Sequence, residues 1–406
     1  MIKDYFKMVV SNLLHRRLRS WLTLLGIFIG IAAVVALISL GQGLQGAIDD
    51  QFAKMGKDKI FIMPGGSALG GATSARLTQR DFDTISRVPG VKDVVGFYYT
   101  SGRVDYKREN AYVILISYPT RQDQGKQLAD EVFAYSMVEG RKLQPGDVYK
   151  VMLGYDYTRD KGVFPKRVNL YDTITVNNQS FEVVGFYEKI GSSDDQNIYI
   201  PQDACEKVLN VSLKTDDKQI VAKTEPGVDP AIVAENIKRD LRKERNVKAG
   251  NEDFTIQTAQ QLLDSFNSIL LIVQVVIIGI AAISLVIGGI GIMNTMYTAV
   301  VERTQEIGIM KAIGARNQDI LIIFLIESGI LGLLGGIIGV LLGLGIAKAV
   351  EVIGGAWLGT PYLRAWWSWE LIFGALAFAF VVGVISGALP AYRASKHRPV
   401  ESLMYE

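Results

Sequence analysis

Four long apolar segments constrain this chain more than any other feature of its sequence. The first, second and fourth contain no charged residue, and the third contains only Glu327. About 20 apolar residues in a helix cross a hydrocarbon core of about 30 Å, because each residue adds about 1.5 Å. We therefore expect an integral membrane protein with four spans. The segments are Trp21–Leu40, Ile269–Met296, Ile320–Ala347 and Leu371–Leu389.

The first segment could also be read as a secretory signal, because Arg16, Arg17 and Arg19 precede it. A signal has an apolar run of only about 7–15 residues, followed by a cleavage pattern of small residues. This run is longer and lacks such a pattern, so an uncleaved anchor is expected.

Positive charge indicates the orientation. Lys and Arg gather before the first span, between the second and third, and after the fourth, whereas the loop between the third and fourth has only Lys348 and Arg364. The positive-inside rule then places both termini in the cytoplasm and residues 41–265 outside a plasma (inner) membrane. The net charge of +2 comes from the membrane-flanking segments, so no nucleic-acid partner is expected.

Residues 41–265 have the patterning of an α+β domain. Lys59–Pro64 and the stretches AYVILIS, DTITVNN, SFEVVGFYE and NIYIP predict strands. A helix should follow Thr78, with Asp81 completing a capping box, and a later helix should place Ile232, Ile237 and Leu241 on one side. The Gly/Ser/Ala segment after Pro64 is expected to be a mobile loop.

No enzyme signature accompanies this domain. It contains no Gly-x-Ser-x-Gly and no histidine, Cys205 is the chain's single cysteine, and His15 and His397 stand in basic stretches, so no metal site is expected. Gly41–Gly46 (GQGLQG) matches a dinucleotide fingerprint but follows a membrane span instead of a strand. No phosphate-binding P-loop is present, so no cofactor is expected on this chain.

Aromatic residues mark the loop between the third and fourth spans. Such rings favour the lipid headgroup layer, which makes an interfacial anchor the main interpretation and a ligand-stacking site the alternative. They are Trp357, Tyr362, Trp366, Trp367 and Trp369.

Residues 302–319 are charged yet lie between two spans. Helical spacing places Ile307, Met310 and Ile313 on one face, which predicts an amphipathic helix. Such a helix could lie on the inner leaflet. Its mixed charges, including Glu302 and Glu306 one turn apart, fit a groove on a cytoplasmic protein better.

The same region carries a family resemblance. ERTQEIGIMKAIGARNQDILIIFLIESGILGLLGGIIGVLLG (302–343) and PAYRASKHRPVESL (390–403) resemble the MacB/FtsX-like ABC permeases, the type VII or mechanotransmission transporters. LTQRDFDTISRVPGVKDV, VEGR, FEVVGF and IYIP are similar to parts of that family's extracytoplasmic core domain. LYDTITV (170–176) departs from the pattern, since relatives often carry a glycine turn there.

The resemblance implies a dimeric permease whose loop between spans two and three is a coupling helix for a cytoplasmic ABC ATPase, which binds ATP-Mg. Some relatives carry a fused ATPase; the short stretch before the first span implies a separate chain here. A periplasmic adaptor and membrane lipid are further possible partners. The implied ATPase contacts are Glu302, Arg303, Glu306, Ile307, Met310 and Lys311.

These expectations divide the chain into segments with defined boundaries. They are a cytoplasmic amphipathic helix (1–17), span 1 (18–40), the extracytoplasmic core domain (41–265), a stalk with span 2 (266–301), the coupling helix (302–319), span 3 (320–347), a short outer loop (348–370), span 4 (371–390) and a cytoplasmic tail (391–406).

Two features inside the spans invite interpretation. Glu327 needs a buried partner, for which Asn294 or Thr298 is suitable, and a proton-relay role is the alternative. Glycines spaced by four allow helices to approach closely, either within the chain or between two copies. They are Gly26, Gly30, Gly335, Gly339, Gly343, Gly383 and Gly387.

Three functions remain open from the sequence. The first is the permease of an ATP-driven exporter of small hydrophobic compounds, peptides or lipid-linked cargo. The second is an FtsX-like transducer that activates an extracytoplasmic partner without transport. The third, a receptor or enzyme without an ATPase, is disfavoured by the coupling-helix signature.

Overall fold

The computed structural model describes residues 17–65, 75–121, 125–209, 219–357 and 364–396. The expected amphipathic helix of 1–17, the loop after Pro64 and residues 397–406 lie essentially outside the described residues. The described chain divides into a helical unit (17–46, 268–357 and 364–396) and an α/β unit formed mainly by residues 47–267.

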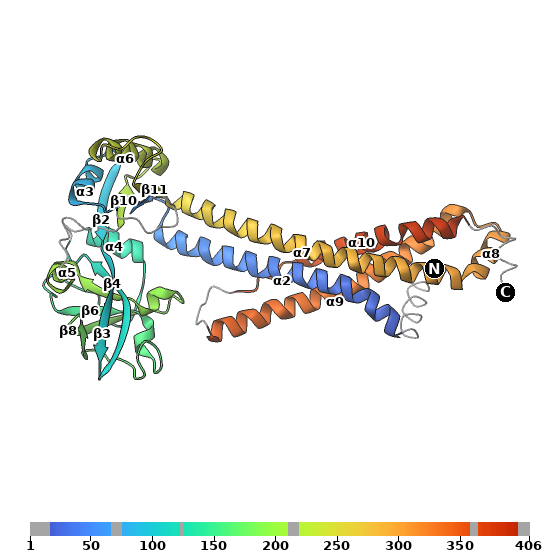
Figure 1. Ribbon diagram of the computed structural model, residues 1–406, viewed down its shortest axis with the longest axis horizontal. Coiled ribbons are helices and arrows are strands. Elements are labelled where there is room, and N and C mark those ends of the chain that lie inside the picture. Colours follow the sequence, from blue (N-terminus) through green and yellow to red (C-terminus); the bar gives the residue numbers. More distant parts are fainter. Residues whose placement is uncertain (1–16, 66–74, 122–124, 210–218, 358–363, 397–406) are drawn as a thin grey trace. The chain divides into compact units, whose positions relative to one another are not determined.

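The helical unit confirms the prediction of four spans. Helices α2 (Arg17–Met55), α7 (Ala259–Glu302), α9 (Asn317–Trp357) and α10 (Trp369–Ser395) are each long and apolar enough to cross a membrane (Figure 1). α9 continues beyond Ala347 to Trp357, so the loop expected to begin at residue 348 begins later. α2 and α7 also contribute residues to both units.

Apolar side chains fill the interior of the helical unit and also cover its surface. Ile31, Ile292 and Phe324 are buried at its centre, whereas Ile283 and Val286 of α7 are more than 60% exposed. Lipid tails replace water around such a surface, and helices satisfy every backbone hydrogen bond internally. This distribution is the one expected of membrane-spanning helices.

The first layer of the α/β unit is an antiparallel sheet in the order β11-β1-β10-β2. Because side chains alternate along a strand, Ile60 and Ile62 of β1 face a cluster with α3 and α6, whereas Phe61 faces the opposite side. The elements are β1 (Lys59–Pro64), β2 (Val91–Phe97), β10 (Gln219–Thr224), β11 (Phe254–Thr258), α3 (Gln79–Ser86) and α6 (Pro230–Glu244).

The cap of α3 and the buried face of α6 can be compared directly with the sequence predictions. Thr78 caps α3, and its N–H donates to the Asp81 carboxylate at 2.7 Å, which confirms the capping box. On α6 the buried face holds Val233, Ala234, Ile237 and Leu241, while Ile232 is 62% exposed. Placing Ile232 on the buried face was therefore wrong by one residue.

The second sheet closes on itself. Its order is β5-β8-β6-β9-β4-β3-β7, and a further pairing of β8 with β7 closes the strands from β8 to β7 into a small barrel. Apolar side chains, among them Leu115, Val151 and Phe181, fill the barrel. The strands are β3 (Tyr99–Tyr106), β4 (Glu109–Tyr118), β5 (Met137–Gly140), β6 (Lys150–Leu153), β7 (Thr173–Val176), β8 (Gln179–Tyr187) and β9 (Ile198–Pro201), with α4 (Lys126–Phe133) and α5 (Gln202–Leu209).

The unusual stretch LYDTITV forms its turn without glycine. Tyr171 takes a φ of 65°, in the left-handed region that glycine enters more easily. Its N–H donates to the Val183 carbonyl at 2.8 Å, which holds the turn against β8. LYDTITV therefore forms a tight turn with tyrosine in the left-handed position.

Asp147 is a hydrogen-bonded carboxylate of the α/β unit whose contribution to stability can be tested by pH. Burial alone would raise its pKa, but hydrogen bonds from Arg141 (2.6 Å), the Gln144 N–H (2.8 Å) and Lys150 hold the pKa at about 2. Its usual value is about 3.9, so the folded state gains stability above about pH 4 and loses it as the pH falls towards 2.

We expect Asp147→Asn to lower the free energy of unfolding by about 1–2 kcal/mol at pH 7, after allowing for the partial exposure of Arg141. The deficit relative to the unsubstituted chain should shrink as the pH falls below about 4. Thermal unfolding of the detergent-solubilised chain at several pH values measures it. A deficit that stays constant between pH 7 and pH 3 would contradict this assignment.

Candidate functional site

The elbow segment, residues 302–319, joins the second and third spans. In the structure it is not the single helix expected from its spacing. α7 ends at Glu302, a short helix α8 covers Thr304–Ala312, and α9 begins at Asn317. The predicted helix was therefore too long, and the polypeptide turns twice.

The first turn occurs at Arg303. Its φ and ψ of −105° and 16° lie outside the helical region, although its N–H still donates to the Ala299 carbonyl at 3.1 Å. The last turn of α7 thus continues to Arg303 by hydrogen bonding, and α8 leaves in a new direction. Arg303 is the pivot of the first turn.

Gly314 makes the second turn. Its φ of 107° suits glycine, and the N–H groups of Gly314 and Ala315 donate to the carbonyls of Lys311 and Met310 at 3.1 and 3.0 Å. This pair of bonds is the Schellman motif that ends helices at a glycine. Periodicity alone extended the helix through this motif, which explains the error.

One side of α8 is bound to the helical unit. Ile307 is fully buried in the same cluster as Ile320 and Phe324, and Met310 packs against that cluster. Ile307 therefore has no surface to offer another protein, contrary to its expected direct contact with an ATPase. Its burial fixes α8 to the bundle.

Lys311 ties the end of α8 to α10. Its Nζ donates to the Ser395 carbonyl at 2.6 Å and to Asn317 Oδ1 at 2.8 Å. Burial lowers the pKa of Lys311, yet a cation at the carbonyl end of α10 also gains from that helix's dipole. Lys311 thus acts within the chain, like Ile307.

Glu327 pairs with Arg303. One guanidinium nitrogen, Nη1, lies 3.1 Å from both carboxylate oxygens, and the two side chains are only 22% (Arg303) and 13% (Glu327) exposed. This corrects the expected pairing with Asn294 or Thr298: the Thr298 hydroxyl instead donates to the Asn294 carbonyl within α7. Arg303 is accordingly turned towards the bundle.

The opposite side of α8 is open. Glu302 and Glu306 are exposed, and so are Ile309 (49%) and Ile313 (82%). Sequence reasoning placed Ile313 with the buried Ile307 and passed over Ile309. The i, i+4 spacing of Ile309 and Ile313 was the signal that could have separated this second apolar face.

The spaced glycines lie against helices of the same chain. A Cβ on Gly26 would lie 2.7 Å from Gly288 Cα, one on Gly343 2.7 Å from the Ala32 carbonyl, and one on Gly383 2.5 Å from the Ser328 carbonyl. Close packing within the chain therefore occupies these positions. Gly30 faces α7, Gly339 faces α2 and Gly387 faces α9 in the same way, and Gly335 is buried.

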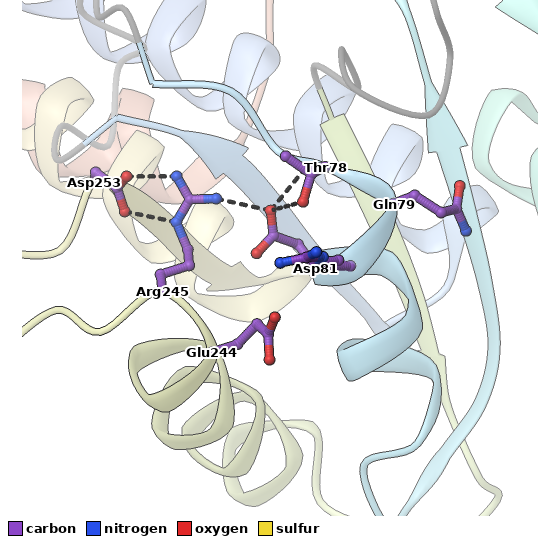
Figure 2. Close-up of a pocket in the computed structure, with 7 residues that line it drawn as sticks. Thr78, Gln79, Asp81, Glu244, Arg245 and Asp253 are labelled. Atoms are coloured by element: carbon purple, nitrogen blue, oxygen red, sulfur yellow. Dashed lines mark hydrogen bonds and ion pairs between the residues drawn. The ribbon is translucent and has the colours of Figure 1, made fainter.

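The α/β unit contains an open pocket between α3 and α6 (Figure 2). At its centre Arg245 bonds to Asp253 through two nitrogens and to Asp81 at 2.7 Å, which ties α3 to the start of β11. Hydrogen bonding to Arg245 lowers the pKa of Asp253. One guanidinium is thus shared by two carboxylates from different parts of the chain, so we interpret the pocket as a structural ion network.

Other expected features can now be placed. GQGLQG lies inside α2 and forms no phosphate-binding loop. The Trp366 N–H donates to the Ser39 carbonyl at 3.1 Å, and the Ser39 hydroxyl donates to the Trp366 carbonyl at 2.8 Å. The side chains of Trp366, Trp367 and Trp369 are exposed. The side chains of Trp357 and Tyr362 lie outside the description. In the described parts of the chain, no group of three His, Cys, Asp or Glu side chains is placed to hold a metal.

Two known protein domains match successive parts of this chain. Residues 20–240 match the MacB-like periplasmic core domain, and residues 278–399 match the FtsX-like permease C-terminal domain. An uncharacterized ABC transporter permease, MJ1507 of Methanocaldococcus jannaschii, is 37% identical over all of this chain and 98% of that protein.

Two further relatives extend the match. The uncharacterized ABC transporter permease YvrN of Bacillus subtilis is 31% identical over 99% of this chain and all of that protein. The macrolide export ATP-binding/permease protein MacB of Bdellovibrio bacteriovorus is 29% identical over 98% of this chain but 61% of its own length. The chain is therefore a multi-pass membrane protein that belongs to the MacB/FtsX-like family of ABC transporter permeases.

Proposed function

We propose that this chain is the permease subunit of an ATP-driven exporter and that α8 is the docking site of a separate ABC ATPase. The supporting observation is the division of α8 into two sides. Ile307 fixes one side to the bundle, while Glu306 and Ile309 are exposed on the other, as are Glu302 just before α8 and Ile313 at its C-cap. An exposed apolar pair beside carboxylates suits a protein groove with basic residues.

The orientation forms part of the proposal. Positive charge gathers at the end of α8 and at the neighbouring ends of α9 and α10, and such charge favours the cytoplasmic side. The residues are Lys311, Arg316, Arg393 and Lys396. This side would carry both termini. The α/β unit would then be extracytoplasmic, with the bundle in the plasma (inner) membrane.

Transmission of movement follows from the attachments of α8. A force applied to α8 would reach α10 through Lys311 and the bundle core through Ile307. α7 runs without interruption from β11 to Glu302, so the same force would reach the α/β unit through a continuous helix. ATP-Mg would bind and react on the ATPase, and two permease copies would work as a dimer with two ATPases.

The cargo would be handled at the extracytoplasmic side. The barrel interior is filled by side chains such as Leu115 and Phe181, which favours an action on outer surfaces over passage through the barrel. Small hydrophobic compounds, peptides or lipid-linked molecules fit this arrangement. A periplasmic adaptor would extend the path where a second membrane is present.

The test is purification of the tagged chain from its native membrane in mild detergent. We expect an ATP-hydrolysing subunit to copurify, and its ATPase activity to rise with macrolides, amphipathic peptides or lipids added to proteoliposomes. Copurification without stimulation by any of these would favour a non-transporting transducer. Absence of an ATPase would overturn the proposal.

A further inference from the structure

The Arg303–Glu327 ion pair connects two spans at the point where α8 begins. Arg303 continues the hydrogen bonding of α7, and Glu327 belongs to α9. Glu327 is the single charged residue between Ile320 and Ala347, so its position in an otherwise apolar span requires an explanation.

Stability alone explains this pair poorly. Removing a carboxylate and a guanidinium from water costs about as much as their attraction returns, and apolar residues of equal volume often stabilise a fold equally well or better. What the pair adds is a fixed orientation of the end of α7 relative to α9. Apolar contacts tolerate sliding, whereas hydrogen bonds from Arg303 to both oxygens of Glu327 depend on angle as well as distance.

We propose that Arg303 and Glu327 are positioning residues that lock the last turn of α7 to α9 and thereby set the direction of α8. Ile307 and Lys311 hold α8 further along, against the bundle core and α10. The pair adds the connection to α9 at the pivot itself. For its effect on ATP-driven movement the inference rests on the proposed function; for the geometry of α8 it does not.

The geometry is testable on the purified full-length chain by spin labelling. Ile313→Cys places one label on α8 and Phe373→Cys another on α10, both at exposed positions, and the native Cys205 is fully buried. α10 has 27 residues, and a helix of that length spans about 40 Å, which suits pulsed electron paramagnetic resonance.

We expect a narrow distance distribution in the otherwise native chain and one about twice as wide in Glu327→Gln and in Arg303→Met. The charge-exchanged double variant Arg303→Glu/Glu327→Arg should narrow it again. Where a single variant fails to fold, the double variant Arg303→Met/Glu327→Leu leaves no unpaired buried charge and should still be broad. An unchanged width in that folded double variant would overturn the proposal.

A matched control exists on the same helix. Lys348 and Glu351 form a 2.7 Å ion pair within α9, so Lys348→Met removes an ion pair on this helix and leaves Glu351 its hydrogen bond from the Ala365 N–H. The distance distribution should stay narrow in this control. Equal broadening in the control would show a general loss of order and would also overturn the proposal.

A second readout addresses coupling. With the copurified ATPase, Arg303→Met/Glu327→Leu should retain ATPase capture but lose about tenfold in the stimulation of ATP hydrolysis by cargo. If no ATPase is captured by any form, the proposed function fails while the distance measurement still decides the role of the pair. If capture, stimulation and distance are all unchanged, the pair has no positioning role and the proposed function stands.

Discussion

The double substitution Ile309→Asp/Ile313→Asp is expected to abolish capture of the ATPase while leaving the permease folded. Both side chains are exposed on α8, and buried apolar anchors of this kind contribute about 2 kcal/mol each to an interface. Their joint loss, about 4 kcal/mol, should weaken binding about 1,000-fold. The measurement is the amount of ATPase retained per permease in detergent, with thermal unfolding as the check on folding.

The matched control is Ile232→Asp. Ile232 is an isoleucine of similar exposure (62%) on α6 of the α/β unit, so the control introduces one aspartate, half the added charge of the double variant, away from α8. Full capture by the control and loss in the α8 variant support the docking site. Equal capture by both would place the ATPase contact elsewhere.

Gly343→Val is expected to destabilise the bundle strongly. The new side chain would begin 2.7 Å from the Ala32 carbonyl and 2.9 Å from Val35 Cβ, and helix backbones cannot yield as a flexible side chain can. We expect a loss of about 3 kcal/mol and a fall in Tm of about 5 °C or more. Thermal unfolding in detergent, followed by tryptophan fluorescence, provides the measurement.

Gly345→Val is the corresponding control. It lies two positions away on α9, changes helix propensity by the same amount, and its added Cβ would have no neighbour within 4 Å. Only the contact with α2 distinguishes the two sites. Similar Tm values for both variants would show that the close approach of α2 and α9 does not limit stability.

The sequence predicted well the features that depend on local pattern. Long apolar runs, three of them without charge and one with Glu327, located the four spans, and Thr78 with Asp81 located the start of α3. Composition alone is enough for the spans, because each must fill a hydrocarbon layer of about 30 Å. The strand at Lys59–Pro64 also appeared with its predicted bounds.

Features that depend on distant parts of the chain were not predictable. The pairing of β3 with β7, which places Val104 opposite Val176 and on which barrel closure also depends, is not marked by any local motif, and the helix facing Gly343 could not be chosen from spacing. Glu327 was expected to pair with a polar residue on α7, but Arg303 reaches it because the chain turns at Arg303. The arrangement of the site therefore depends on a turn that local sequence patterns did not indicate.

Residues in and next to α8 have two different roles, which local sequence patterns could not separate. Glu302 and Glu306 stayed on the open side as a docking surface requires, and Ile309 joined them. Ile307 and Lys311 proved to hold the helix in place, because α8 lies against both α9 and α10. Periodicity identified an amphipathic helix but could not say which apolar side faces the chain itself.

The open side of α8 is the proposed contact with a cytoplasmic ABC ATPase. A photocrosslinking amino acid at position 313, in the full-length chain in native membranes, tests it most directly, with the same group at position 232 for comparison. We expect a covalent adduct from position 313, and not from position 232, and the protein in that adduct should bind ATP. A partner without nucleotide-binding activity, or crosslinking only to lipid, would contradict it.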